Sequence, residues 1–391
     1  MKTLVDIVNF NADGSCLSAA RWLEALRGGA ASQLCGWLRS YVDSGCKVNL
    51  GFIGGTVADM VELNSEAIAI VNQHPEIFEV LVRPFAHDIA LLRSLAGFRL
   101  NLEFGRAIIT KEFRRCSDWY LPPEFMLTNR QLADLRELGA EGVFVNPARF
   151  EAGVQRRLPH RPYIVTGVAD ATLPCIPFDG ALTEAYLQTL QRLSGDLWQA
   201  SFATTKNDPV FLWRDGESVL LVPSGIEREQ FWLQTMKTQA NRRFLSEAVA
   251  ETQFTSPDAL AQDSYRSYPV HSFGAWMKEF RMLGYLRALE PFENRLATLS
   301  KDEQVIWLQA INSDVLSAVE KESPTVPLRS SGSKTELFSH SILRSERGFE
   351  GEDYLCLLES FDPVATRRRV AQSSAPHLVK LRARLDYFGK R

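Results

Sequence analysis

The sequence predicts an α/β protein in which helices cover a parallel sheet, followed by a purely helical region. Three observations predict this class. Short apolar runs of strand length alternate with helical patterns up to about residue 213. Polar residues follow several of these runs, as they do at the carboxyl rim of a parallel sheet. From about residue 229, helical patterns follow one another without strands between them.

The order of elements follows from these patterns. The strand candidates are residues 4–11, 47–52, 78–82, 142–146, 161–166 and 209–213. The helical patterns between the strands are residues 19–26, 32–44, 64–74 and 129–138, and those beyond them are 231–243, 273–289 and 301–320. We therefore expect a sheet domain over residues 1–228 and a helical subdomain over 229–391. Residues 321–350 are rich in Ser, Pro, Gly and charge, which is typical of a mobile loop.

The composition is that of an ordinary folded protein. The chain has 391 residues, of which 45% are hydrophobic and 23% charged, and its formal net charge is -3. A nucleic-acid binder needs a strongly basic face, so we expect no nucleic-acid partner. No long apolar run and no signal-peptide pattern is present, so we expect no membrane association and a cytoplasmic location. The six cysteines show no CxxC spacing, which argues against a zinc ribbon and a disulfide framework.

The most informative segment is residues 119–126, Trp-Tyr-Leu-Pro-Pro-Glu-Phe-Met. It places Glu124 after two prolines and beside aromatic side chains that suit the face of a sugar ring. A rigidly held acid at the end of a buried strand is typical of a catalytic carboxylate in a carbohydrate-processing enzyme. The alternative is an acid that stabilises the amino end of the helix after it.

A second acid follows the strand candidate at residues 209–213, in the sequence Arg214-Asp215-Gly216-Glu217. Two carboxyl groups on one rim are the minimum for acid and base catalysis at a glycosidic bond. We expect Asp215 to be the second catalytic residue, with Glu217 as its substitute. The alternative is a tight turn between two strands, for which Asp-Gly is a common signal.

Other rim positions supply the remaining candidates. We expect substrate contacts from Asn11, Asp13, Arg83, His87, Asp88, Trp119, Tyr120, Trp213, Arg214, Glu217, His271 and Trp276. For each group a plainer interpretation exists: a turn at Asp13, a helix cap at His87, and core packing for the aromatic residues. The Gly54-Gly55-Thr56 sequence lacks the lysine and the spacing of a phosphate-binding loop.

These segments, in this order, resemble glycoside hydrolase family 57. The similar stretches cover roughly residues 4–320 and are residues 79–88, 119–124, 210–217, 268–276 and 307–314. The resemblance implies a distorted, seven-stranded (β/α) barrel with a C-terminal helical subdomain. It also implies a retaining mechanism in which Glu124 is the nucleophile and Asp215 the acid/base, with no cofactor. The same barrel is shared more distantly with polysaccharide deacetylases.

The chain departs from the family pattern in ways that bear on the substrate. It has Asn9-Phe10-Asn11 where the family has His-Gln-Pro, and Arg83 to Asp88 where the family has a Gly-Gly-Tyr-Tyr-like run. We therefore expect a small or anionic glycoside, met by Arg83 or Arg214, because a guanidinium binds anionic groups in a bidentate manner. Two alternatives stay open: a metal-dependent carbohydrate deacetylase or hydrolase that uses Asp13, His87 and Asp88, or a sugar-binding relative without turnover.

Overall fold

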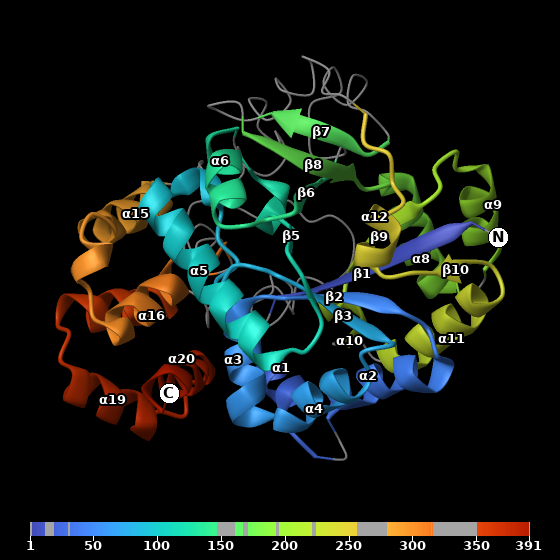
Figure 1. Cartoon of the computed structure of the whole chain (residues 1–391). Helices are drawn as coiled ribbons and strands as arrows, with labels where there is room; N and C mark the ends of the chain where they lie inside the picture. The colour runs from blue at the N-terminus through green and yellow to red at the C-terminus, as the bar shows by residue number, and fades with distance from the viewer. Residues whose placement is uncertain are drawn as a thin grey trace.

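The computed structural model describes most of the chain and is shown in Figure 1. The described residues are 2–11, 19–29, 32–127, 129–146, 161–166, 171–192, 195–220, 224–255, 280–313, 315 and 350–390. They form a mixed α/β fold with helices around a largely parallel sheet, as the sequence predicts.

The larger sheet has six strands and is parallel throughout. Its order is β10-β1-β2-β3-β4, and β9 pairs with β1. The strands are β1 (Thr3–Phe10), β2 (Val48–Phe52), β3 (Phe78–Leu81), β4 (Cys116–Ser117), β9 (Val210–Asp215) and β10 (Asn241–Arg242). In register, Asn9 of β1 lies opposite both Gly51 of β2 and Asp215 of β9. Polar residues at the carboxyl ends of β1 and β9 are thereby placed side by side.

The smaller sheet continues the chain directly after the larger one. Its order is β5-β6-β8-β7, with β5 (Trp119–Tyr120), β6 (Gly142–Val145), β8 (Thr172–Pro177) and β7 (Tyr163–Thr166), and only β7 is antiparallel. A single residue, Asp118, separates β4 from β5. Within the described residues no strand pairing joins the two sheets, so the seven-stranded barrel stays a prediction.

Strand alternation decides which side chains face the helices and which face the space between the sheets. Successive side chains of a strand point to opposite faces. On β1, Leu4 and Val8 pack into the large core beneath the helices, whereas Val5 and Ile7 pack with residues of both sheets, such as Phe144. Asn9 is odd-numbered like Val5 and Ile7, so it lies on the face of β1 that lines the interior between the sheets.

Helices follow most strands, and Figure 1 shows them surrounding the sheet layer. They are α1 (Ala19–Leu26), α2 (Gln33–Ser44), α3 (Gly54–Leu63), α4 (Ser65–Gln73), α5 (Leu95–Glu112), α6 (Asn129–Glu137), α8 (Gly180–Arg192), α9 (Asp196–Thr204), α10 (Glu217–Leu220), α11 (Gly225–Lys237) and α12 (Leu245–Val249). Local chemistry sets the ends of α2, because Ser32 accepts a hydrogen bond from the Cys35 amide and Gly45 ends the helix with a φ of 69°.

The C-terminal helices form a second hydrophobic core. They are α15 (Phe280–Glu293), α16 (Lys301–Ala310), α19 (Pro363–Gln372) and α20 (Pro376–Gly389), and Trp307 and Leu381 are fully buried among them. Arg384 of α20 makes a fully buried, bidentate ion pair with Asp59 of α3, at 2.7 and 2.9 Å. This pair fixes the C-terminal helices to the helix layer of the sheet, which lies beside them in Figure 1.

The structure bears on the expected domain boundary and on the expected loop. The boundary between residues 228 and 229 falls inside α11, and β10, beyond it, pairs with β1 of the large sheet. The loop expected at 321–350 lies outside the described residues except for its last residue.

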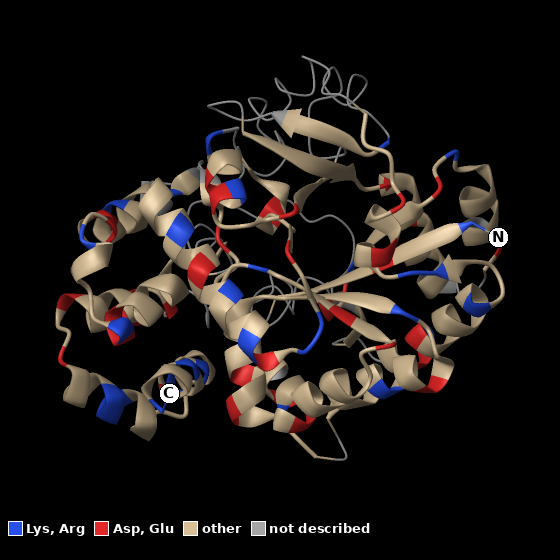
Figure 2. Ribbon diagram, viewed as in Figure 1, with Lys and Arg blue, Asp and Glu red and all other residues tan. Residues whose placement is uncertain are grey.

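Among the described residues, no helix is both long and apolar enough to cross a membrane. Figure 2 shows acidic and basic residues interspersed over the outer helices.

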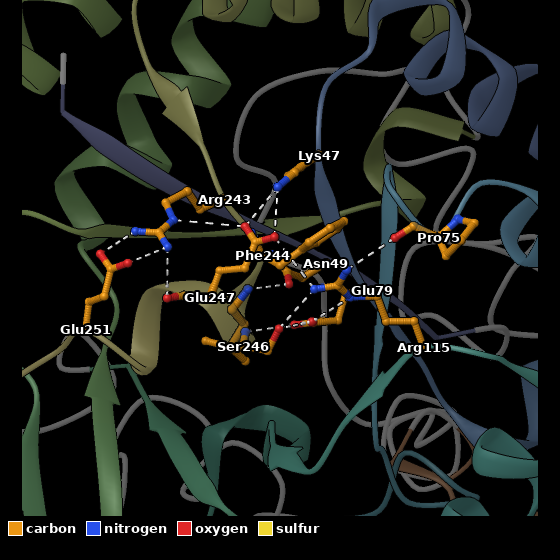
Figure 3. A network of polar contacts seen from close by, with 11 residues as sticks. Lys47, Asn49, Pro75, Glu79, Arg115, Arg243, Phe244, Ser246, Glu247 and Glu251 are labelled. Atoms are coloured by element: carbon orange, nitrogen blue, oxygen red, sulfur yellow. Dashed lines mark hydrogen bonds and ion pairs between the residues drawn. The ribbon is translucent and has the colours of Figure 1, made fainter.

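A polar network holds α12 at the amino-terminal ends of the strands (Figure 3). Glu79 of β3 is 1% exposed and accepts hydrogen bonds from the Ser246 amide at 3.0 Å and from Arg115 Nε at 3.1 Å. Asn49 of β2 accepts one from the Leu245 amide at 2.9 Å. Each buried polar group therefore has a partner, and α12 closes this end of the sheet layer.

Candidate active site

A pocket of about 120 Å³ opens at the opposite end, where the strands have their carboxyl ends. Seven of the predicted site residues line it together: Asn11, Arg83, His87, Glu124, Trp213, Asp215 and Glu217. They come from the segments that follow β1, β3 and β5, and from β9 with the turn after it. Ligands of parallel sheets bind at this rim, so the pocket has the position expected of an active site.

Glu124 is held in an unusual backbone conformation. Its φ is 52° and its ψ 11°, and Phe125 also has a positive φ of 56°. A residue with a Cβ pays about 1–2 kcal/mol in this left-handed region, and such residues cluster at functional sites. The surrounding turn imposes the conformation through hydrogen bonds from the Phe125 and Met126 amides to the Pro122 and Pro123 carbonyls, at 2.9 and 3.0 Å.

The surroundings of Glu124 bear on its plainer interpretation. Helix α6 begins only at Asn129, so Glu124 lies outside the first turn of α6 and belongs to a short 3-10 turn over Pro123–Phe125. Phe125 anchors the turn, because its buried ring packs edge-on against Trp213 and Phe178, with centroids at 5.2 and 5.7 Å. The two prolines and this anchor leave the carboxylate as part of the pocket wall.

Asp215 ends β9 and begins a strand-to-helix turn. Its carboxylate accepts a hydrogen bond from the Glu217 amide at 3.1 Å, which caps α10. Gly216 is required between them, because a Cβ there would lie 2.3 Å from the Phe10 ring. The segment therefore does not form the hairpin turn that Asp-Gly also signals. Glu217 in turn accepts a hydrogen bond from the Asn11 amide, which ties the ends of β9 and β1 together.

Arg83 and Asn9 form the floor of the pocket. Arg83 is 1% exposed, its Nη1 donates to the Gly51 carbonyl at 3.4 Å, and its Nε has no hydrogen-bond partner among the described residues. The Oδ1 of Asn9 is likewise buried without one. Burial lowers the pKa of Arg83 to about 10, against the opposing effects of Tyr120 and Glu217, so the guanidinium stays charged at neutral pH.

His87 links the pocket to the C-terminal helices. Its Nδ1 lies 2.8 Å from Ser313 Oγ and 3.9 Å from Glu124 Oε1. Burial lowers the pKa of the imidazole to about 3, and the nearby positive charge of Arg83 acts in the same direction. His87 is therefore neutral at physiological pH and is held by hydrogen bonds.

Arg214 is a correction to the sequence prediction. Its side chain is 1% exposed and forms ion pairs with Asp6 at 2.7 Å and with Glu229 at 2.9 Å. The alternation of β9 gives the reason, since Trp213 and Asp215 face the pocket and Arg214 between them faces the helices. Arg214 is a structural residue and not a substrate contact.

Three further candidates also lie in the interior. Trp119 and Tyr120 are each 2% exposed, and Trp119 packs against the Phe144 ring at 5.5 Å, so both are core residues. Both carboxylate oxygens of Asp88 accept hydrogen bonds from Arg93 Nε at 3.0 Å. Burial raises the pKa of Asp88 to about 6, against the lowering effect of Arg93. These three side chains are packed and paired away from the pocket lining.

The metal-site alternative has little support from the described side chains. Arg93 and Ser313 engage Asp88 and the Nδ1 of His87, and no cluster of three or more His, Cys, Asp or Glu occurs in the described part of the chain. Asp13, His271 and Trp276 lie outside the described residues. The amides of Gly54 and Gly55 bond to the carbonyls of Pro84 and Phe85, which leaves no phosphate-binding loop there.

Sequence reasoning missed five residues at this site. Asn9, Leu121, Pro122 and Phe125 line the pocket, and Ser313 contacts His87 from behind. Asn9 had a usable signal, because it lies two positions before Asn11 and therefore on the same face of the strand. Ser313 had none, because 226 residues separate it from His87 in the chain.

Solved structures that share this fold include enzymes of glycoside hydrolase family 57. A GH57-type branching enzyme from Pyrococcus horikoshii superposes with a TM-score of 0.65 at 10% identity, over 99% of this chain and 95% of that one. A 4-alpha-glucanotransferase from Thermococcus litoralis has a TM-score of 0.55 at 13% identity, over 82% of this chain. An alpha-mannosidase from Enterococcus faecalis also scores 0.55, at 9% identity, over 92% of this chain and 43% of that one.

These likenesses establish the fold. The chain has the fold of glycoside hydrolase family 57 enzymes, whereas the seven-stranded barrel and the C-terminal subdomain that the resemblance implies stay predictions. The aligned region spans about half of the Thermococcus glucanotransferase, or 53% of it. The sequence matches no protein-family model and no curated protein.

Proposed function

We propose that the protein is a retaining glycoside hydrolase or transglycosylase that acts on a small glycoside, with Glu124 as nucleophile and Asp215 as acid/base. One observation carries the proposal: carboxylates from segments 91 positions apart line a single small pocket at the strand ends. The shared fold of family 57 enzymes supports the same reaction class.

The chemistry needs one proton donor and one nucleophile. Asp215 protonates the glycosidic oxygen while Glu124 attacks the anomeric carbon, so the bond to the leaving group breaks as the glycosyl-enzyme ester forms. Asp215, now a carboxylate, then takes a proton from water or from an acceptor sugar, which attacks the same carbon and releases Glu124. This mechanism requires the two carboxyl groups to lie about 5–5.5 Å apart in the enzyme with bound substrate.

The charges of the pocket favour an uncharged sugar. Of the two arginines expected to meet an anionic substrate, Arg214 is buried in ion pairs, and Arg83 lies in the field of Glu217. The remaining acids, Glu124 and Asp215, repel a second negative group. We propose that Trp213 supplies an apolar face for the ring, since it lines the pocket and is only partly buried.

A screen of nitrophenyl glycosides tests this proposal. The parent, Glu124→Gln and Asp215→Asn are compared on neutral glycosides and on the matching glucuronide, with and without a chelator. We expect turnover of a neutral glycoside that the chelator leaves unchanged and Glu124→Gln abolishes. Glu217→Gln is the matched control, since it removes a third pocket carboxylate and should keep more activity than Asp215→Asn. Chelator-sensitive release of acetate from acetylated sugars would contradict the proposal.

A further inference from the structure

The segment after α16 reaches the pocket and holds His87 at two points. The Ser313 amide donates to the His87 carbonyl at 2.7 Å, and Ser313 Oγ lies 2.8 Å from His87 Nδ1. Asn312 pairs with Asp88 in an isolated antiparallel bridge. Ser313 is fully buried and Asn312 is 1% exposed, so water does not compete for these contacts. A part of the chain far from the sheet thus fixes both the backbone and the ring of His87.

The oxygens around Nδ1 decide where the imidazole proton lies. A carboxylate is only an acceptor, whereas a serine hydroxyl both accepts and donates. With Glu124 Oε1 at 3.9 Å and Ser313 Oγ at 2.8 Å from Nδ1, a proton on Nδ1 has an acceptor at 2.8 Å and a negative charge nearby. A lone pair on Nδ1 would instead face that negative charge. Among the described residues, Arg83 and Glu124 are charged groups close to the ring, Asp215 and Glu217 line the same pocket, and the positive charge of Arg83 disfavours a second proton.

We infer that Ser313 is a positioning residue that holds His87 as the Nδ1–H tautomer, so that Nε2 offers a lone pair to a hydroxyl group of the substrate. His87 lines the pocket, and its ring makes no other hydrogen bond within the described residues. The tautomer itself is independent of the reaction. The assignment of Nε2 to a sugar hydroxyl rests on the proposed function.

The tautomer is measured directly by ¹⁵N NMR of the histidine rings in the parent protein. The six histidines are resolved with a His87→Gln variant, which removes the His87 signals. We expect a neutral ring protonated at Nδ1 from about pH 5 to 8, the range in which an ordinary histidine titrates. A ring protonated at Nε2, or an imidazolium that forms near pH 6.5 as in an unperturbed histidine, would overturn the inference whether or not the enzyme turns over.

Variants at Ser313 separate positioning from packing. Ser313→Ala should shift His87 toward the Nε2–H tautomer, and Ser313→Thr, which keeps the hydroxyl, should restore Nδ1–H. Ser40→Ala is the control, because Ser40 is a buried serine of α2 outside the pocket. An unchanged tautomer in a folded Ser313→Ala protein would refute the role of Ser313.

Kinetics test the assignment to the substrate. On a nitrophenyl glycoside that the parent hydrolyses, Ser313→Ala should lower kcat/KM by about tenfold, the typical effect of one hydrogen bond. The decrease in kcat/KM caused by Ser313→Ala should be smaller for the deoxy sugar that lacks the hydroxyl group facing Nε2. A full tenfold loss on every deoxy analogue would refute the contact. Absence of turnover on all glycosides would count against the proposed function, while the NMR result still decides the tautomer.

Discussion

The left-handed conformation of Glu124 predicts that glycine at this position stabilises the fold relative to alanine. With a φ of 52°, any residue with a Cβ is strained, and both Glu124 and alanine carry this cost of about 1–2 kcal/mol. Glycine avoids it but loses about 0.5–1 kcal/mol through the greater entropy of its unfolded chain. We therefore expect Glu124→Gly to be about 1 kcal/mol more stable than Glu124→Ala, a net effect of these two terms.

Urea unfolding of the two variants, followed by tryptophan fluorescence, measures this difference. Both variants lack the carboxylate, so its interactions cancel in the comparison and only the backbone term remains. The control is the same pair of substitutions at Glu184, an exposed position within helix α8, where alanine should be the more stable by about 1 kcal/mol. If alanine equals or exceeds glycine in stability at residue 124, the strain attributed to the turn over residues 122–126 is refuted.

Three further predictions concern burial. Arg214→Met should lower the free energy of unfolding by about 3–5 kcal/mol, because it leaves Asp6 buried without its main partner; a stable variant with a selective rise in KM would contradict this role. In the folded protein the imidazole of His87 stays neutral, whereas in the unfolded chain it binds a proton below about pH 6.5. The free energy of unfolding is therefore unaffected by this group above that pH and falls below it. Between pH 7 and 5, the free energy of unfolding of the parent should fall by about 2 kcal/mol more than that of His87→Gln. Equal losses in urea unfolding would refute the buried neutral ring. Gly216→Ala should impair catalysis, because its Cβ meets the Phe10 ring and displaces Asp215; unchanged kcat would contradict that geometry.

The sequence predicted the parallel strands and most of the pocket because both depend on local patterns. Runs such as residues 4–11 and 78–82 are mostly apolar on both faces, as is typical of buried parallel strands, and polar residues follow them. The carboxyl-end rule then brings Asn11, Arg83, Glu124 and Asp215 to one rim without any knowledge of tertiary contacts.

The sequence did not predict strand β8 or helix α5, because the residue types in both disfavour the structure that they form. Strand β8 contains Pro174 and Pro177, which strands disfavour. Helix α5 contains Gly97 and Gly105, which lower helix propensity. Gly105 is nevertheless required, because a Cβ there would lie 2.1 Å from the Arg83 carbonyl oxygen. Tertiary packing overrides propensity at such positions.

Two site errors have different physical origins. Arg214 was misassigned although strand alternation between Trp213 and Asp215 already placed it on the other face. Ser313 was beyond reach, because only the docking of the C-terminal helices brings it to His87. A sequence pattern contains the first kind of information and not the second.

Mass spectrometry of a trapped glycosyl-enzyme identifies the residue that attacks the anomeric carbon. The protein is incubated with the 2-deoxy-2-fluoro fluoride of a sugar whose nitrophenyl glycoside it hydrolyses, then digested, and the labelled peptide is sequenced. We predict one fluoroglycosyl group, bound as an ester to Glu124. Label on another carboxylate, or turnover that inverts the anomeric configuration and leaves the protein unlabelled, would contradict it.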